Sequence, residues 1–135
     1  MGQIVNHYLI DTNILITYLN GEAPQHVHEI IEKLIRSSFT VSVITKMELL
    51  GFRGYSDGEF LTANNFLSHA KVLSLIPEIV EKTIFLRRNY SIKLPDAIIA
   101  ATALYHCLIL VTHNCADFEK ISGIQLMDPY KNSRL

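Results

Sequence analysis

Short apolar runs alternate with longer stretches of helical spacing along this chain. The apolar runs are rich in β-branched residues and occupy residues 7–10, 39–44, 72–75, 107–111 and 124–127. They carry few charges, which is typical of strands that are covered on both faces in a parallel sheet. The pattern therefore predicts five short strands.

Between these runs, apolar residues recur at intervals of three and four positions. This spacing predicts helices over residues 25–36, 45–52, 59–69, 78–89 and 95–105. Pro24, Pro77 and Pro95 each stand where a helical pattern opens, a position at which the missing N–H costs no hydrogen bond. The helix over 95–105 is almost wholly apolar, so we expect it to be the most buried. Strand followed by helix, repeated, predicts an α/β fold with a parallel sheet and right-handed crossovers.

Length and composition fit a single globular domain. The chain has 135 residues, of which 49% are hydrophobic, and this excludes a disordered or collagen-like protein. We expect one domain over residues 1–135, with a frayed tail at 131–135. Twelve Lys and Arg residues against 13 Asp and Glu residues give a net charge of −1. No overall positive field attracts a polyanion, although a local patch or a bound metal ion can reverse the sign of the potential.

Two cysteines are too few for a disulfide framework and favour a reducing compartment. The N-terminal segment has no basic region followed by an apolar region, as a secretory signal would. The apolar runs are far shorter than the roughly 20 residues that a membrane span needs. These features predict a soluble, cytoplasmic protein without a membrane partner.

Four carboxylates stand where an open α/β sheet binds its ligands, at the carboxyl ends of the strands. Asp11, Glu48 and Asp117 follow the first, second and fourth predicted strands, and Asp96 begins the helix that leads to the fourth strand. Each also has an ordinary structural explanation. Asp11 suits a helix N-cap, Thr45 and Glu48 are spaced as a capping box, Asp96 complements a helix dipole, and Asp117 fits an Asx turn.

The four acids taken together favour function over these separate explanations. Converging carboxylates repel one another, so they must bind protons or share a cation. A cluster that offers only oxygen ligands selects Mg²⁺, with Mn²⁺ as an alternative. An acidic metal site without a glycine-rich phosphate loop suggests metal-assisted hydrolysis of a phosphodiester.

Four segments spread over nearly the whole chain form a combined motif: Ile10–Asn13, Glu48, Leu94–Ala103 and Leu110–Phe118. Together they resemble the PIN-domain family, and within it the small VapC-type toxins of toxin–antitoxin pairs. The resemblance implies a three-layer α/β/α, Rossmann-like fold with a parallel sheet of about five strands in the order 3-2-1-4-5. It implies a magnesium-dependent endoribonuclease, a cognate antitoxin that covers the cleft, and a homodimer.

The same resemblance assigns roles to individual residues. It gives catalytic and metal-binding roles to the four acids, Asp11, Glu48, Asp96 and Asp117. It gives supporting roles to three polar residues, Asn13, Thr112 and Asn114, of which Asn114 braces its loop. His113 departs from the family pattern, where a basic residue is expected, so a phosphate contact at this position would depend on pH.

The expected reaction is in-line attack of an activated water on phosphorus, which leaves a 5′-phosphate and a 3′-hydroxyl. Five basic residues are candidate RNA contacts, with a solvated surface as the alternative: Lys46, Arg53, Arg87, Arg88 and Lys93. Tyr55 and Tyr90 could each either stack on a base of the RNA or pack in the core. The stripe formed by Phe60, Leu61, Phe66 and Leu67 is open between ordinary core and a dimer or antitoxin surface. The alternative function is a catalytically silent PIN-like module that binds RNA or protein.

Overall fold

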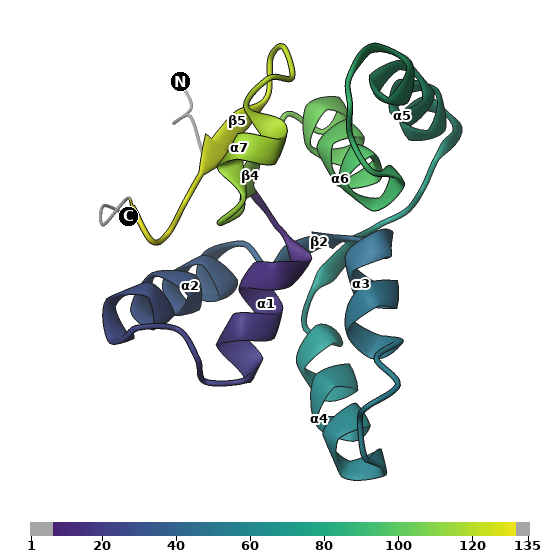
Figure 1. Cartoon of the computed structure of the whole chain (residues 1–135). Coiled ribbons are helices and arrows are strands. Elements are labelled where there is room, and N and C mark those ends of the chain that lie inside the picture. Colours follow the sequence, from purple (N-terminus) through teal and green to yellow (C-terminus); the bar gives the residue numbers. More distant parts are fainter. Residues whose placement is uncertain (1–6, 132–135) are drawn as a thin grey trace, which may run out of the picture.

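A computed structural model describes residues 7–131 of the chain (Figure 1). The strands are β1 (Tyr8–Ile10), β2 (Thr40–Ser42), β3 (Lys71–Leu73), β4 (Ile109–Val111) and β5 (Gln125–Met127). The helices are α1 (Thr12–Leu19), α2 (Gln25–Ser37), α3 (Val43–Leu50), α4 (Asp57–Leu67), α5 (Pro77–Asn89), α6 (Leu94–Tyr105) and α7 (Cys115–Phe118). The tail expected to fray lies outside the described residues except for Lys131, which is in a turn.

All strand pairs are parallel, as predicted. β4 lies between β1 and β5, with Val111 opposite both Ile10 and Met127, while β2 pairs with β3. β1 also lies against β2, which gives the expected spatial order 3-2-1-4-5. The expectation of one continuous sheet needs correction, because the described strands form two hydrogen-bonded groups that separate between β1 and β2. Side-chain packing, including Ile10 and Val41 in one apolar core, joins the two groups instead.

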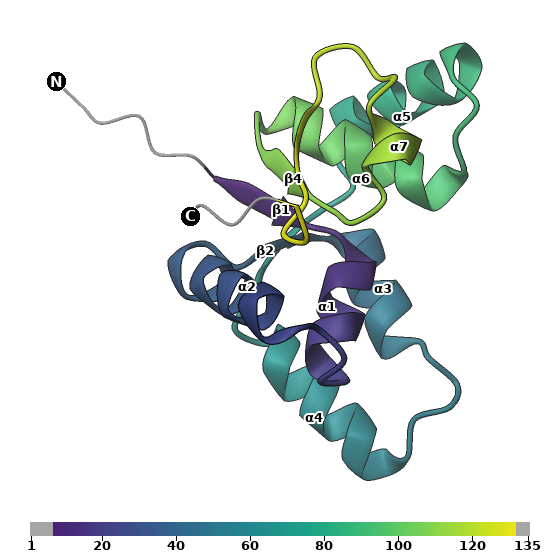
Figure 2. The ribbon, with the colours of Figure 1, turned by 60° about the vertical axis from the view of Figure 1, so that its left-hand side comes forward.

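Helices cover both faces of the strands, so the fold has three layers. Alternate strand residues face opposite sides, as in any pleated strand. Ile10 and Val111 pack in a core with α1 and α2, whereas Leu9 and Leu110 pack in a second core with α5 and α6. Figure 2 shows α5, α6 and α7 on one side of the strands and α1 to α4 on the other. This confirms the α/β/α architecture.

Two helices start directly at the carboxyl ends of strands. α1 starts directly after β1 and is not among the predicted helices, although Asp11 suits an N-cap at this point. α3 starts at Val43 because Ser42, the last residue of β2, caps it by accepting a hydrogen bond from the backbone N–H of Ile44 at 3.2 Å. The abrupt change from strand to helix places the side chains of the first helical turns close to the strand ends.

The alternative capping box at Thr45 and Glu48 is not formed, because both residues lie inside α3. A capping box does occur at the start of α4, where Ser56 and Glu59 exchange hydrogen bonds of 3.1 and 2.9 Å. Glu48 is thereby free to take another partner.

α6 is the most buried of the described helices, as expected from its composition. Every residue from Ala97 to Ala103 is buried. Its alanines allow close approach to α5 and to β4. Asp96 lies in the first turn of this helix, so the packing of α6 fixes the position of its carboxylate. No helix within residues 7–131 is long and apolar enough to cross a membrane.

Candidate active site

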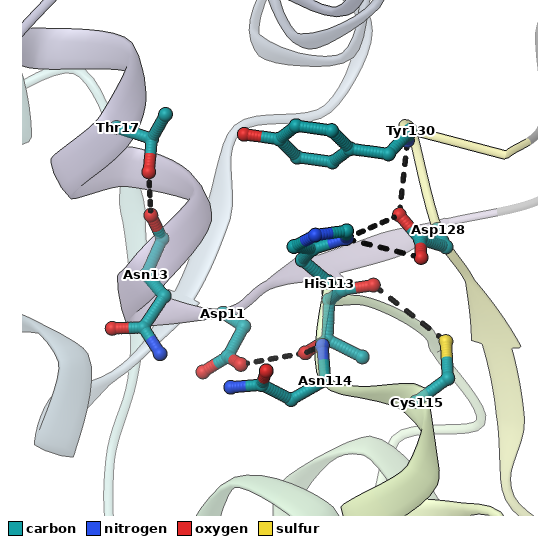
Figure 3. A network of polar contacts seen from close by, with 9 residues as sticks. Asp11, Asn13, Thr17, His113, Asn114, Cys115, Asp128 and Tyr130 are labelled. Carbon is teal, nitrogen blue, oxygen red and sulfur yellow. Dashed lines mark hydrogen bonds and ion pairs between the residues drawn. The ribbon is translucent and has the colours of Figure 1, made fainter. Parts of the chain in front are cut away.

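Asp11 occupies the point where β1 turns into α1. Its side chain is only 4% exposed. Oδ1 accepts a hydrogen bond of 2.8 Å from the backbone N–H of Thr12, which confirms the N-cap interpretation. Oδ2 accepts a second hydrogen bond of 2.8 Å from the hydroxyl of Thr112, at the end of β4 (Figure 3). The carboxylate therefore caps a helix and joins two neighbouring strand ends at once.

The pKa of Asp11 is raised to about 6. Burial is the main cause, because desolvation disfavours the charged form. The hydrogen bonds from Thr112 and Thr12 lower the pKa, but the nearby carboxylates of Asp96 and Glu48 raise it further. A cation beside Asp11 would relieve both the desolvation and the repulsion.

Glu48 reaches the same region from α3. Its Oε1 accepts a hydrogen bond of 2.7 Å from the hydroxyl of Thr12, which also lies 2.9 Å from the hydroxyl of Thr45. Both threonines are buried. The three side chains connect the start of α1 to α3 and hold one oxygen of Glu48 in place.

Asp96 and Asp117 complete the acidic region from the other side. Asp96 lies in the first turn of α6, and Asp117 lies in the short helix α7 after β4. Burial raises the pKa of Asp96, and the charges of Asp117 and Glu48 raise it further, while Lys93 lowers it. Both carboxylates line one cleft of about 370 Å³. All four predicted acids are thus near enough to influence at least one other member of the set.

The donor set suits a hard cation that keeps much of its own hydration. Within residues 7–131, the four acids offer only oxygen and form no ion pair with Lys, Arg or His. No three His, Cys, Asp or Glu side chains in this range are placed to hold a metal ion together. Mg²⁺ commonly uses one or two carboxylates together with water and substrate phosphate rather than a cage of protein ligands. The arrangement fits that mode of binding and not a closed structural site.

Comparison with known proteins identifies the family. The PIN domain family matches residues 8–124. This chain is a PIN domain. No curated protein sequence matches it significantly.

Solved structures agree with this assignment over almost the full length. A chain from a toxin–antitoxin complex of Klebsiella pneumoniae is 34% identical, with a TM-score of 0.74, covering 93% of this chain and 99% of the other. DNA-bound VapBC from Salmonella typhimurium gives 28% identity and a TM-score of 0.76, with the same coverage. VapBC-1 from Haemophilus influenzae gives 27% identity and a TM-score of 0.74, again with 93% and 99% covered. The family resemblance inferred from the four sequence segments is confirmed.

The three polar residues expected to support the acids differ in what they contact in this PIN domain. Thr112 is fully buried, donates to Asp11 and accepts a hydrogen bond of 3.0 Å from the backbone N–H of Asn114. Asn114 is therefore braced through its backbone, and its side chain makes no hydrogen bond within residues 7–131. Asn13 is exposed on α1, where its backbone carbonyl accepts a hydrogen bond of 2.9 Å from the hydroxyl of Thr17 (Figure 3).

His113 belongs to a cluster that the sequence did not reveal. Its Nδ1 lies 3.2 Å from both carboxylate oxygens of Asp128, which is 6% exposed. Its ring stacks on Tyr130 with 3.9 Å between the centroids, and the backbone N–H of Tyr130 donates to Asp128 at 2.9 Å. The one available signal was the position of Asp128 directly after the last strand, which parallels that of Asp11 after the first.

The predicted RNA contacts separate into two groups. Arg87 and Lys93 line the cleft with Asp96 and Asp117, and Lys120, which the sequence did not single out, lines it with them. The other candidates do not line this cleft: Lys46, Arg53 and Arg88. Of the predicted RNA contacts, only Arg87 and Lys93 therefore lie beside the acidic residues of the cleft.

The two tyrosines also take different environments. Tyr90 packs against the core around α6, and its hydroxyl accepts a hydrogen bond of 3.2 Å from the backbone N–H of Ser122. This supports core packing for Tyr90. Tyr55 contacts the exposed ring of Phe52 edge-on and lines a small cavity with Glu48.

Proposed function

We propose that this PIN domain is a magnesium-dependent endoribonuclease that acts as the toxin of a cytoplasmic toxin–antitoxin pair. The observation that carries the proposal is the gathering of four carboxylates from separate segments, three of which follow strand ends. Burial and mutual repulsion raise the pKa values of Asp11 and Asp96. Asp11 caps α1, but an asparagine can cap a helix without the cost of burying a charge, so the charge itself favours a ligand at this position.

In this proposal Asp11 and Asp96 would hold the metal ion, with Glu48 and Asp117 acting directly or through water. The chemistry that Mg²⁺ would supply there is a lower pKa of water, and thus a nucleophile near neutral pH. Thr112 keeps the Asp11 carboxylate oriented, and Thr12 does the same for Glu48. Because water attacks in place of the 2′-hydroxyl, the products carry a 5′-phosphate and a 3′-hydroxyl.

The partners proposed for the chain are an RNA substrate, a cognate antitoxin and a second copy of the chain. Structures of toxin–antitoxin complexes that match over nearly the whole chain support the antitoxin. On α4, Phe60 and Leu61 are exposed, while Phe66 and Leu67 pack into the core. Only the first pair is available to an antitoxin or to a homodimer.

Cleavage of a mixed RNA pool tests the proposed reaction. Wild-type protein should cleave in Mg²⁺ and stop in EDTA, and Asp96→Asn should reduce the rate by roughly a hundredfold or more. Asp57→Asn makes the same chemical change in an exposed acid at the start of α4 and should leave cleavage unchanged. Cleavage that survives EDTA or Asp96→Asn, or a 2′,3′-cyclic phosphate product, would contradict metal-assisted hydrolysis.

Expression in a bacterial host separates the enzyme from the silent binding module. A nuclease toxin should arrest growth, and Asp96→Asn should relieve the arrest. Equal arrest by both proteins would favour a module that binds its target without cleaving it.

A further inference from the structure

The cleft beside Asp96 and Asp117 has a cationic side. Arg87 near the end of α5, Lys93 before α6 and Lys120 after α7 line it. None of these three cations forms an ion pair with a carboxylate within the described part of the chain. Their charge is therefore available to an anion that enters the cleft.

Two of the cations are already held in position. Nη1 of Arg87 donates a hydrogen bond of 2.7 Å to the carbonyl of Ile92, and Nζ of Lys120 donates to the carbonyl of Ser91. A guanidinium group has five N–H donors and an ammonium group has three, so both keep donors for a ligand. Side chains that are held before binding lose less conformational freedom when the anion arrives.

The arrangement of charge favours a polyanion with regularly spaced phosphates. The net charge of −1 supplies no general attraction to RNA, so affinity must come from a local cluster. Cations and carboxylates share this cleft, and consecutive phosphates can serve both, one at the cations and the next at the metal-binding acids. Arginine binds phosphate oxygens through two parallel hydrogen bonds, and lysine adds a point charge.

We propose that this cleft binds the phosphodiester next to the scissile bond of single-stranded RNA, with Arg87 and Lys120 as the main contacts and Lys93, three residues before Asp96, as a third. The inference rests on the proposed function, because the four acids locate the scissile phosphate. It adds a binding site for a phosphate that does not react, and it assigns that site to particular basic residues.

RNA binding measured without cleavage tests the site. The probe is a fluorescently labelled single-stranded RNA, and the background is Asp11→Asn, a position outside the cleft. In this background, Lys120→Ala and Arg87→Ala should each weaken binding by roughly tenfold at low salt. Each should also reduce the slope of log affinity against log salt by about 0.7, the value for one contact to a single strand.

Arg88→Ala is the matched control, because Arg88 is the exposed neighbour of Arg87 on α5 and does not line the cleft. It should change the affinity by less than about twofold. Lys120→Arg keeps the charge and should retain most of the affinity. Arg87 and Lys120 also hold the loop carbonyls of Ile92 and Ser91, so the melting temperature of both variants is measured. If both variants lower it, Lys93→Ala decides the outcome, because Lys93 lines the cleft without holding a carbonyl in the described part of the chain.

Three results would overturn the inference. Equal losses for Arg88→Ala and the cleft variants would indicate diffuse attraction, and unchanged affinity in the cleft variants would remove the site. If Lys120→Ala weakened the binding of a labelled oligoglutamate peptide but left RNA binding unchanged, the cleft would belong to an acidic protein segment. Loss of RNA binding in the cleft variants, combined with no cleavage by wild-type protein, would support the phosphate site and defeat the proposed hydrolysis.

Discussion

The ionised carboxylate of Asp11, which the proposed reaction needs, destabilises the fold. Its pKa of about 6 in the folded protein lies above the value of 3.8 for a free side chain. The folded state therefore prefers the protonated form, and the contribution to stability is present below about pH 4 and lost as the pH rises through about 6. Above that pH, the charged carboxylate is held at a cost in the absence of a metal ion.

We predict that Asp11→Asn stabilises the protein in EDTA at pH 8 by about 1–3 kcal/mol. Asparagine can still cap α1, and its amide can donate to the hydroxyl of Thr112. At pH 4 most of the difference should disappear, because Asp11 in the folded wild-type protein is then protonated. Urea unfolding at the two pH values measures the effect, with Asp57→Asn as the control. A variant that is less stable than wild type at pH 8 would show that the burial of this charge costs little.

Thr112 offers a second test at the same place. Thr112→Val keeps the shape but leaves the buried Oδ2 of Asp11 without its donor, and we expect a loss of about 1–3 kcal/mol. It should also slow RNA cleavage, because the carboxylate loses its orientation. Thr112→Ser retains the hydroxyl and should retain most of both properties. Urea unfolding and RNA cleavage rates are measured for both variants. Equal stability and equal rates for Thr112→Val and Thr112→Ser would show that the Thr112 hydroxyl neither stabilises nor orients Asp11.

For single residues, the sequence predicted the side chains that follow strand ends. It did not predict side chains that come together only through contacts between distant segments. Asp11, Glu48 and Asp117 could be found because strand patterns are visible in a single sequence. Lys120 could not, because it joins the cleft only when α7 packs beside the loop before α6. Asp128 was missed because its partner is 15 positions away, across the β4–β5 pair.

Among the elements, α6 sets the distance between Asp96 and the sheet. Ala100 is fully buried in the core that this helix shares with β1 and β4. We predict that Ala100→Leu destabilises the protein by about 1–3 kcal/mol or more, because the added carbons have no space. Urea unfolding measures the loss, and Tyr105→Leu, at the exposed end of α6, should change stability far less. A tolerated Ala100→Leu would mean that α6 can move away from the sheet.

Element boundaries were predictable where a proline stands at the start of the helical pattern. The predicted ranges of α2 and α5 nearly coincide with the observed ones, because Pro24 directly precedes α2 and Pro77 is the first residue of α5. The run at 39–44 looked like strand to its end because its β-branched residues favour strands. In the structure, Ser42 ends the strand and caps α3, so local capping overrides propensity. α1 is not among the predicted helices, although Asp11 suits an N-cap, because its eight residues offer only about two turns of apolar pattern.

For the molecule as a whole, the parallel order of the strands is what brings the site together. The ends of β1 and β4 lie side by side, so Asp11 and Thr112 meet although 101 positions separate them. The α/β pattern of the sequence predicted this convergence. It did not predict that β1 and β2 are not hydrogen-bonded to each other, because a single sequence does not show which strands are paired by hydrogen bonds. The same convergence concentrates negative charge, and a metal ion should therefore stabilise the entire fold.

We predict that Mg²⁺ raises the melting temperature of the wild-type protein. A ligand that binds only the folded state at one hundred times its dissociation constant stabilises it by about 2.7 kcal/mol, equivalent to several degrees here. Asp96→Asn should abolish most of this shift, and Asp57→Asn should retain it. The shift should also diminish as the pH falls through about 6, because protonation of Asp11 then competes with the ion. Thermal unfolding with and without Mg²⁺ provides the measurement, and an equal shift in wild type and Asp96→Asn would place the bound ion elsewhere.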